Sequence, residues 1–475
     1  MFKRVPVPEG IYPPFFSRYL EQEAGIVNFF NGKFREEESY IRRAYYLQER
    51  SFPQEVRELL VELNRNLMVQ PQGDWEEKVR DRRTLFVITG QQPGLFAGPL
   101  LVLYKGLTAV KLARRLEELM QVPVQPLFWV ATEDHNVAPL MRTFVPSPDG
   151  DIGLIRTPCS TNGLPAGLVY LDDGAVADTL HQLYSTSGAG RHYDEVLAWL
   201  SSAANGGKNN LAGWFMQIMS RLCAAEGLIL FDPMQAAARN LYTAPLLQTL
   251  ECSSKAHNSI AMAEAALKDA AFPLQVQRRG RESFIMITWE DRRYPLLREG
   301  EHYYTPKGEL SLSRSELLTL IVEQPSIFSP GVLLRPLFQD TLFPTLAYVA
   351  GPGELAYFAQ IKNLYAMFHM EMPILYPRMG VTLLEPSLKK IVSEHHINLD
   401  TLLTDLSKNA RKQGGWNTLH LQLLCNNLWP RFSPQERVFN IVPYLIAYGF
   451  SFWNDFCEKF EGFPGHYFYC WKRGV

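Results

Sequence analysis

Residues 84–104 form a run of 21 residues without a formal charge, long enough to cross a bilayer as a helix. The centre of the run is GQQPG at 90–94, however, and in lipid this segment would leave backbone groups without hydrogen-bond partners. A buried strand over 85–89, a glycine loop over 90–99 and a helix over 100–121 explain the run better. We therefore expect the core of a soluble protein and no membrane partner.

A second apolar run, PVQPLFWVAT at 123–132, follows this helix. Strand, helix and strand at this spacing form a βαβ unit, whose strands are parallel and whose sheet is covered on both faces. The same pattern recurs as a strand at 345–350, a helix at 355–370 and a strand at 373–377. A further helix and strand are expected at 213–227 and 228–233. The fold class is therefore α/β, with two parallel-sheet halves.

The other segments divide around these halves. Residues 1–80 have the pattern of amphipathic helices that pack outside a core. Short alternating segments at 272–277, 283–289 and 292–297 indicate antiparallel hairpins, and Ser313 with Glu316 forms a capping box. We predict five units: an N-terminal helical segment (1–80), the first core half (81–135), a mixed insertion (136–330), the second core half (331–385) and a C-terminal helical region (386–475).

Composition excludes several classes of protein. The 47 basic and 49 acidic residues give a net charge of −2, so no polybasic nucleic-acid arm or acidic tail organises the chain. None of the six cysteines forms a C-x-x-C pair, and the ten histidines include no H-E-x-x-H, so we predict neither a disulfide framework nor a zinc site. The N-terminus has no apolar signal-peptide stretch, which favours a cytoplasmic location.

Ligands of open parallel sheets bind at the carboxyl ends of the strands, beside helix N-termini. The loop at 89–99 lies at such an end, and its glycines would let the backbone approach an anion closely. It matches neither G-x-G-x-x-G nor G-x-x-x-x-G-K-[ST], so a tight strand-to-helix turn is an equally good explanation.

Two further features fall at strand ends. Residues 133–135, Glu-Asp-His, could supply a general base, although a surface loop with an N-cap at Asp134 explains them nearly as well. The turn at 351–354, GPGE, offers helix N–H groups, and Arg335 upstream could clamp an anion or form a surface salt bridge.

The motifs at these places resemble the signature of one family, the bacillithiol biosynthesis cysteine-adding enzymes, or BshC family. They occur in order over about residues 85–445, which is most of the chain. The matching residues are Thr89-Gly90-Gln91-Gln92, Gly94-Leu95, Gly98-Pro99, Tyr104-Lys105, Phe128-Trp129-Val130-Ala131, Glu133-Asp134-His135, Arg335-Pro336-Leu337, Pro344-Thr345-Leu346-Ala347, Ala350-Gly351-Pro352-Gly353-Glu354, Pro377-Arg378 and Gln435-Glu436-Arg437-Val438-Phe439-Asn440-Ile441.

The resemblance implies a Rossmann-like core similar to that of class I aminoacyl-tRNA synthetases, interrupted by connecting-peptide insertions. It also implies the last step of bacillithiol synthesis, in which L-cysteine is joined to the amine of glucosaminyl-malate to give a low-molecular-weight thiol. Family members dimerise through a long antiparallel coiled-coil stalk. Here fewer than 50 residues separate Lys389 from Gln435, with Gly414-Gly415 between them and no heptad series. We therefore expect a reduced or absent stalk, and a monomer or a dimer not built on a long coiled coil.

The resemblance to synthetases further implies ATP, with Mg²⁺, as the activating nucleotide, and no resident metal. Adenylate and acyl-phosphate activation both stay open. Candidate residues fall in three groups: nucleotide or phosphate contacts at Thr89, Gly90, Gln91, Gln92, Gly94, Gly98, Gly351, Gly353 and Glu354; catalytic groups at Glu133, Asp134 and His135; and substrate contacts at Trp129, Arg335 and Arg378.

Two alternative functions use the same fold. One is another nucleotidyltransferase-type enzyme, which an assay of amino-acid dependence would separate from a cysteine ligase. The other is a nucleotide-binding protein of the pathway with little catalysis, in which a change at His135 would leave thiol synthesis intact.

Overall fold

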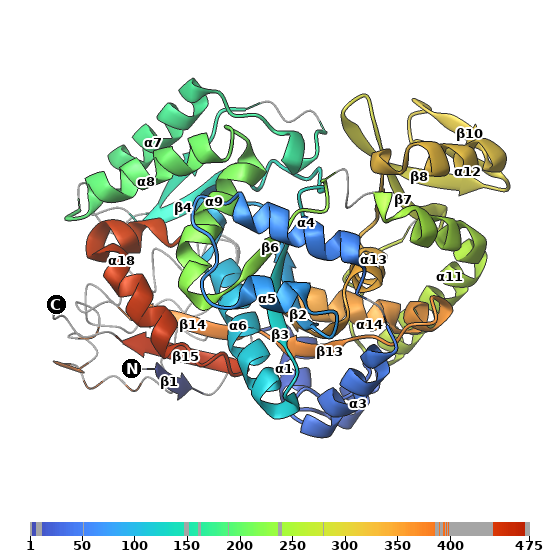
Figure 1. Ribbon diagram of the computed structural model, residues 1–475, viewed down its shortest axis with the longest axis horizontal. Coiled ribbons are helices and arrows are strands. Elements are labelled where there is room, and N and C mark those ends of the chain that lie inside the picture. Colours follow the sequence, from blue (N-terminus) through green and yellow to red (C-terminus); the bar gives the residue numbers. More distant parts are fainter. Residues whose placement is uncertain are drawn as a thin grey trace, which may run out of the picture.

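The computed structural model (Figure 1) shows a central parallel sheet between helical layers. The structure describes residues 2–5, 12–50, 52–146, 152–159, 163–188, 190–235, 240–278, 280–384 and 440–470, with five further residues between 389 and 398. The segment on which the stalk prediction depends therefore lies almost wholly outside the described residues, and so do 435–439 of the last motif.

The central sheet has five parallel strands in the order β13-β12-β2-β3-β6. Along β3, Leu127 and Trp129 belong to one hydrophobic cluster and Phe128 and Val130 to a second, so apolar side chains cover both faces. This confirms the predicted α/β class. The strands are β2 (Leu85–Gln91), β3 (Val124–Val130), β6 (Ile229–Phe231), β12 (Thr345–Ala350) and β13 (Ile374–Pro377).

Helices α6, α13 and α14 adjoin these strands and place the candidate residues. α6 (Leu100–Met120) connects β2 to β3, and α14 (Pro352–Met367) connects β12 to β13, as the sequence predicts. α13 (Arg335–Leu342) runs into β12. Both βαβ units therefore bring a helix N-terminus to the carboxyl edge of the sheet.

The N-terminal segment is mostly helical, as predicted, and packs against the core, but Phe2–Val5 form a strand that the sequence analysis did not predict. Buried Arg43 donates hydrogen bonds to the carbonyls of Thr345 (3.0 Å) and Glu371 (2.7 Å), and so fastens this segment to the start of β12. The helices are α1 (Pro14–Leu20), α2 (Ala24–Val27), α3 (Glu37–Gln48), α4 (Gln54–Arg65) and α5 (Trp75–Arg80).

The insertion between the core halves has two parts, which lie at opposite upper corners of Figure 1. β6 falls inside the predicted range 136–330, yet it pairs with β3 in the central sheet. The insertion is therefore not separate from the core. The first part contains β4 (Arg142–Pro146), β5 (Ile152–Arg156), α7 (Asp173–Ser187), α8 (Tyr193–Gly206) and α9 (Leu211–Cys223).

The second part contains the antiparallel sheet β10-β9-β8-β7-β11. The predicted hairpin of β7 with β8 and the capping box of Ser313 with Glu316 are both confirmed. The predicted strand at 272–277 is wrong, because its backbone bonds to a side chain of α14 instead of a strand. The elements are α11 (Thr243–Asp269), β7 (Glu282–Trp289), β8 (Arg292–Glu299), β9 (His302–Tyr304), β10 (Ser311–Ser313), α12 (Arg314–Glu323) and β11 (Phe328–Pro330).

The two ends of the described chain meet in a small sheet, β1-β15-β14, at the lower left of Figure 1. β1 (Phe2–Val5) is antiparallel to β15 (Gly465–Cys470), and β14 (Met379–Leu384) is parallel to it. The C-terminal region contains the expected helix, α18 (Val442–Lys459), and β15 is an addition that the sequence analysis did not predict. No helix in the described part combines the length and hydropathy that crossing a membrane requires.

Candidate active site

The carboxyl ends of β2, β12 and β13 bring candidate residues from distant parts of the chain to one edge. Ala350 of β12 is in register with Pro377 of β13, so Gly351 and Arg378 follow adjacent strand ends. Gln91, the last residue of β2, is in register with Val130 of β3, and residues 133–135 follow three positions later. The sheet therefore gathers all three predicted features at the edge where ligands of such sheets bind.

Lys105 lies at the centre of this edge. Its side chain is buried on α6, and its ammonium donates to the Gly90 carbonyl and lies 2.7 Å from a Glu354 carboxylate oxygen. The Gln91 side-chain oxygen is 3.4 Å from the same nitrogen. Lys105 therefore joins the end of β2 to the first turn of α14.

Two arginines add positive charge to this cluster. Burial lowers the pKa of Lys105, Glu354 opposes that shift, and the charges of Arg335 and Arg378 reinforce it. Burial also acts to lower the pKa of Arg335, but the phenol groups of Tyr357 and Tyr348 and the Glu133 carboxylate outweigh it and raise the pKa. The three cations, which we call the Lys105 cluster, make this edge attractive to phosphate and carboxylate groups.

Glu354 organises the start of α14. One carboxylate oxygen accepts a hydrogen bond from the Gly351 N–H (2.8 Å), and the other accepts one from the Tyr348 hydroxyl (2.7 Å). The Glu354 carboxylate thus caps the N-terminus of α14 through the Gly351 N–H. The Gly351 N–H donates to Glu354, and the Glu354 carboxylate pairs with Lys105. Both groups therefore bond within the protein, whereas the sequence analysis expected them to contact a nucleotide or phosphate.

A second polar group follows β3. The Asp134 carboxylate accepts hydrogen bonds from the Gln92 amide (2.7 Å) and from the Asn136 backbone N–H (2.9 Å). These bonds confirm that the 89–99 loop and residues 133–135 lie together, and they fix the orientation of the carboxylate.

His135 lies beside this carboxylate. Burial lowers the pKa of its imidazole, the Arg293 charge of β8 lowers it further, and Asp134 opposes them. The Nδ1 atom of His135 is buried and has no hydrogen-bond partner among the residues that the structure describes. The imidazole is therefore neutral at neutral pH and has a nitrogen available to accept a proton.

Thr89 and Trp129 are buried in the sheet. The Thr89 hydroxyl donates to the Val349 carbonyl (2.9 Å) and so joins β2 to β12, which gives it a structural contact where we expected a phosphate contact. Trp129 packs on Phe231 with ring centroids 4.8 Å apart, and its indole N–H is buried with no hydrogen-bond partner in the described part of the chain. Gly90 is required because an added Cβ would lie 2.8 Å from the Trp129 carbonyl oxygen.

Gly94 and Gly98 belong to a turn held by a residue of the last motif. The Asn440 amide donates to the carbonyls of Phe96 and Gly98, each at 2.8 Å. Gly98 has a φ of +70°, and a Cβ on Gly94 would lie 3.1 Å from the Gly98 Cα. The Leu95 and Gly98 N–H groups bond to carbonyls within the protein. The contacts of both glycines thus favour the alternative of a tight turn over a phosphate cradle.

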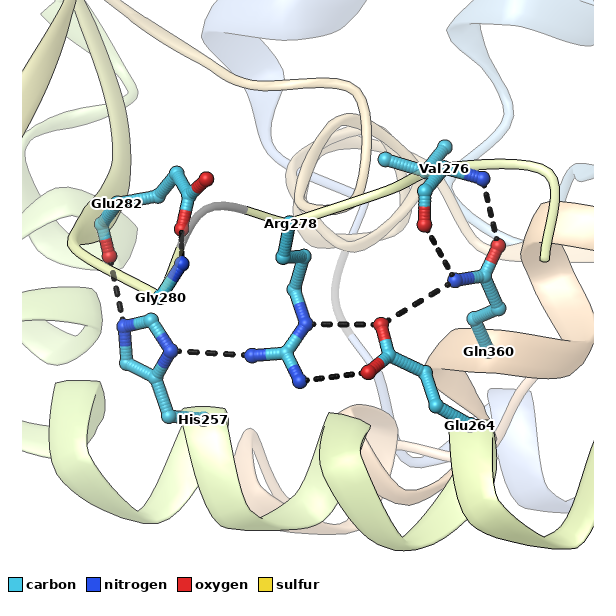
Figure 2. Close-up of polar contacts among 7 residues, drawn as sticks. All are labelled: His257, Glu264, Val276, Arg278, Gly280, Glu282 and Gln360. Atoms are coloured by element: carbon cyan, nitrogen blue, oxygen red, sulfur yellow. Dashed lines mark hydrogen bonds and ion pairs between the residues drawn. The ribbon is translucent and has the colours of Figure 1, made fainter.

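Gly353 lies beside Gln275, whose side-chain atoms would be 3.6 Å from an added Cβ. The residues after Gln275 are held by the polar network of Figure 2. Gln360 of α14 exchanges two hydrogen bonds of 2.9 Å with the Val276 backbone, and Arg278 makes two contacts of 2.8 Å with Glu264 of α11. This network ties the insertion to the helix whose N-terminus borders the Lys105 cluster.

His257 completes the network in Figure 2. Its Nδ1 lies 3.1 Å from an Arg278 guanidinium nitrogen, and its Nε2 lies 2.8 Å from the Glu282 carbonyl oxygen. Because a guanidinium can only donate, Nδ1 accepts and Nε2 carries the proton. Each polar group therefore has a defined donor or acceptor role, and together these bonds fix the positions of Val276, Arg278 and Glu282.

Four contributors to this site were not among the residues assigned from the sequence: Lys105, Tyr348, Arg293 and Asn440. Lys105 and Asn440 belong to the matching motifs, but the sequence analysis gave neither of them a role. The apolar run LLVLY directly before Lys105 was the available signal, because a solvent-exposed lysine is unusual in such a run. No pattern marked Arg293, which reaches His135 from a different sheet. Among the described residues, no group of three or more His, Cys, Asp or Glu side chains is placed to hold a metal ion.

Comparison with known proteins agrees with this architecture. Residues 2–379 match the model of the N-terminal Rossmann-like domain of the bacillithiol biosynthesis protein BshC, and residues 380–469 match that of its C-terminal coiled-coil domain. The fold and the family match thus define a protein with a Rossmann-like core. The chain belongs to the BshC family, as the sequence motifs predicted.

Several relatives are named "Putative cysteine ligase BshC". The protein of Heliobacterium modesticaldum is 27% identical, over 93% of this chain and 95% of its own length. The protein of Geobacillus kaustophilus is 31% identical, over 80% of this chain and 70% of its own length. The protein of Natranaerobius thermophilus is 32% identical, over 69% of this chain and 60% of its own length. The arginyl-tRNA synthetase-type structure from Campylobacter jejuni aligns with a TM-score of 0.28 at 10% identity, over 76% of this chain and 69% of that chain, which supports no conclusion.

Proposed function

We propose that this protein is an ATP-dependent ligase that joins L-cysteine to the amine of glucosaminyl-malate. The observation that carries the proposal is the Lys105 cluster at the carboxyl edge of a Rossmann-like sheet, in a member of the BshC family. The name of the relatives supplies cysteine as the substrate. Phosphates of ATP and the two carboxylates of malate are the anionic groups that such a cluster attracts.

Amide formation requires activation of the cysteine carboxylate, because its oxygen is a poor leaving group. In the proposed reaction, that oxygen attacks the α-phosphorus of ATP and pyrophosphate leaves. The sugar amine then attacks the acyl carbon, AMP leaves and one proton passes to a base. Mg²⁺ is expected to arrive with ATP as part of the substrate.

The chain's own residues divide these tasks. Arg335 and Arg378 are the proposed clamps for phosphate or malate oxygens, and Lys105 with Glu354 holds the strand and helix ends between them. His135 is the proposed base, because its pKa is lowered and no described residue forms a hydrogen bond with its Nδ1. Asp134, fixed by Gln92, opposes the lowering of that pKa and stabilises the imidazolium as it forms.

The first test is exchange of labelled pyrophosphate into ATP with each amino acid in turn. An adenylating ligase should show exchange with cysteine and less exchange with serine. Because serine differs only by a hydroxyl in place of the thiol, the difference in exchange rate is expected to be modest. Addition of glucosaminyl-malate should then give the amide, detected by mass. ADP release without exchange would favour acyl-phosphate activation. If no nucleotide is consumed with any acceptor, the ligase proposal fails and the binding-protein alternative becomes the better one.

The second test separates the two steps. His135→Ala should slow amide formation by about 10²–10⁴-fold and leave cysteine-dependent exchange largely intact, if His135 takes the amine proton. Asp134→Asn should act in the same direction but less strongly, because the side chain still receives the Gln92 hydrogen bond in part. Loss of both steps would instead assign this strand end to nucleotide binding. Because the pKa of His135 is lowered from 6.5, a neutral base also predicts that the rate is maintained at pH 6.5 and falls only at lower pH.

A further inference from the structure

A pocket of about 510 Å³ lies apart from the strand-edge site. The C-terminal half of α6, strand β13, the start of α3 and the turn before β15 surround it, and Arg4 of β1 closes one side. Arg115 lines the pocket ten residues after Lys105 on the same helix. At 1.5 Å per residue the two side chains leave α6 about 15 Å apart, so the pocket is distinct from the Lys105 cluster.

Positive charge dominates the wall of this pocket. Arg4, Arg35 and Arg115 line it, whereas Glu37 is the single acidic residue among the described residues of its lining. Among the described residues none of the three arginines forms an ion pair with a carboxylate. The wall therefore carries an excess of charge that an anion inside the pocket would neutralise.

Arg115 and Arg35 are held in place by neutral groups. Arg115 donates to the Glu461 carbonyl (3.0 Å) and to the Tyr376 hydroxyl (2.8 Å), and Arg35 donates to the Leu20 carbonyl (2.7 Å). Burial raises the pKa of Tyr376 to about 12, although Arg115 opposes the shift, so the hydroxyl stays neutral. These bonds orient both guanidinium groups without cancelling their charge, which is the arrangement of an anion site.

The same pocket offers aromatic surface. The Arg115 guanidinium lies 4.3 Å from the Phe463 ring centroid, and Phe463 is 45% exposed, although it is a large apolar side chain. Phe34, Tyr40 and Tyr467 also line the pocket. A flat or apolar body could pack on these rings while its anionic group meets the arginines.

We infer that this arginine–aromatic pocket binds a small organic anion, namely a phosphate or carboxylate group carried on an aromatic or other apolar body. The inference does not depend on the proposed ligase activity. It rests on the three arginines without carboxylate partners, on the exposed ring of Phe463 and on a volume within the range of small-molecule sites.

Isothermal titration calorimetry of the full chain with phenyl phosphate tests this inference, with inorganic phosphate and phenol as the two partial ligands. Phenyl phosphate should bind at least tenfold more tightly than inorganic phosphate, and phenol should give no measurable heat. Arg35→Gln and Arg115→Gln should each weaken phenyl phosphate binding at least tenfold. Arg42→Gln makes the same charge change at an exposed position of α3 outside the pocket and should leave affinity unchanged.

Arg335→Gln identifies which site holds the probe. If the inference is correct, this change at the strand-edge site leaves phenyl phosphate binding to the arginine–aromatic pocket intact. Binding that is lost in Arg335→Gln and kept in Arg35→Gln would overturn the inference, and so would equal affinities for phosphate and phenyl phosphate. The amide-forming activity is measured separately, so failure of the ligase proposal cannot be mistaken for failure of this one.

Discussion

At the scale of single residues, His466 is a buried imidazole whose protonation opposes folding. Its Nδ1 lies 3.3 Å from the Tyr12 hydroxyl, and its Nε2 lies 2.8 Å from the Thr382 hydroxyl. Burial, together with the charge of Arg378, lowers its pKa from 6.5 to about 4. The folded protein therefore keeps this group neutral over a range of pH in which the unfolded chain protonates it.

This difference predicts a loss of stability in acid. As pH falls from 6.5 to 4, the unfolded state binds a proton that the folded state does not, so His466 should reduce the free energy of unfolding by up to about 3 kcal/mol. Urea unfolding at pH 7.5 and pH 4.5 measures the effect. His466→Gln should show a smaller decrease between the two pH values. An identical decrease in both proteins would mean that other groups cause it.

Lys105 and Glu354 are expected to be energetically coupled. Lys105→Met leaves the mostly buried Glu354 carboxylate without its cation and should cost roughly 3 kcal/mol in the free energy of unfolding. The double variant Lys105→Met with Glu354→Gln removes the remaining charge as well, so it should be more stable than the sum of the two single effects predicts. Urea unfolding of the four proteins gives the coupling energy, and additive effects would contradict a pair.

At the scale of elements, Asn440 holds the turn between β2 and α6. Asn440→Ala removes the hydrogen-bond donor for the buried carbonyls of Phe96 and Gly98 and should cost about 2–3 kcal/mol. Asn363→Ala, at an exposed position of α14, is the matched control. Thermal and urea unfolding would measure both. Equal, small effects would show that the turn holds its shape without Asn440.

Gln360 connects α14 to the segment that precedes β7. Its side-chain amide forms two hydrogen bonds with the Val276 backbone, which a neighbouring strand would otherwise supply. Gln360→Ala removes both hydrogen bonds, so the amide hydrogens of residues 274–282 should exchange with solvent faster. Hydrogen exchange followed by mass spectrometry measures this, with the peptides of β2 and β3 as internal controls. Unchanged exchange at 274–282 would show that the pairing of Arg278 with Glu264 is sufficient.

At the scale of the whole molecule, the assembly stays a prediction. The alignment with the Heliobacterium protein spans 536 positions, more than the 475 residues of this chain, which is consistent with a segment missing here. We expect a monomer, or a dimer through a surface other than a long stalk. Light scattering measures the mass in solution, and a tight dimer that disappears when residues 390–430 are deleted would contradict the expectation.

The amino-acid pattern was sufficient to predict the local elements of the core. Apolar runs and helical periodicity placed β2, α6, β3, β12 and α14, because these patterns reflect which face of a segment is buried. The order of strand and helix then required parallel pairing, and parallel strands required one common carboxyl edge. The motifs at that edge were enough to place Arg335, Glu354 and residues 133–135 near one another.

Tertiary structure alone decided which groups bond at that edge. Lys105 pairs with Glu354 almost 250 residues away, Asn440 holds Gly98, and Arg293 approaches His135 from another sheet. Strand β1 has only four residues, too few to show a period, and it forms because it pairs with β15, whose other edge pairs with β14. Contacts of this kind depend on the packing of whole elements, and no local pattern in the sequence encodes them.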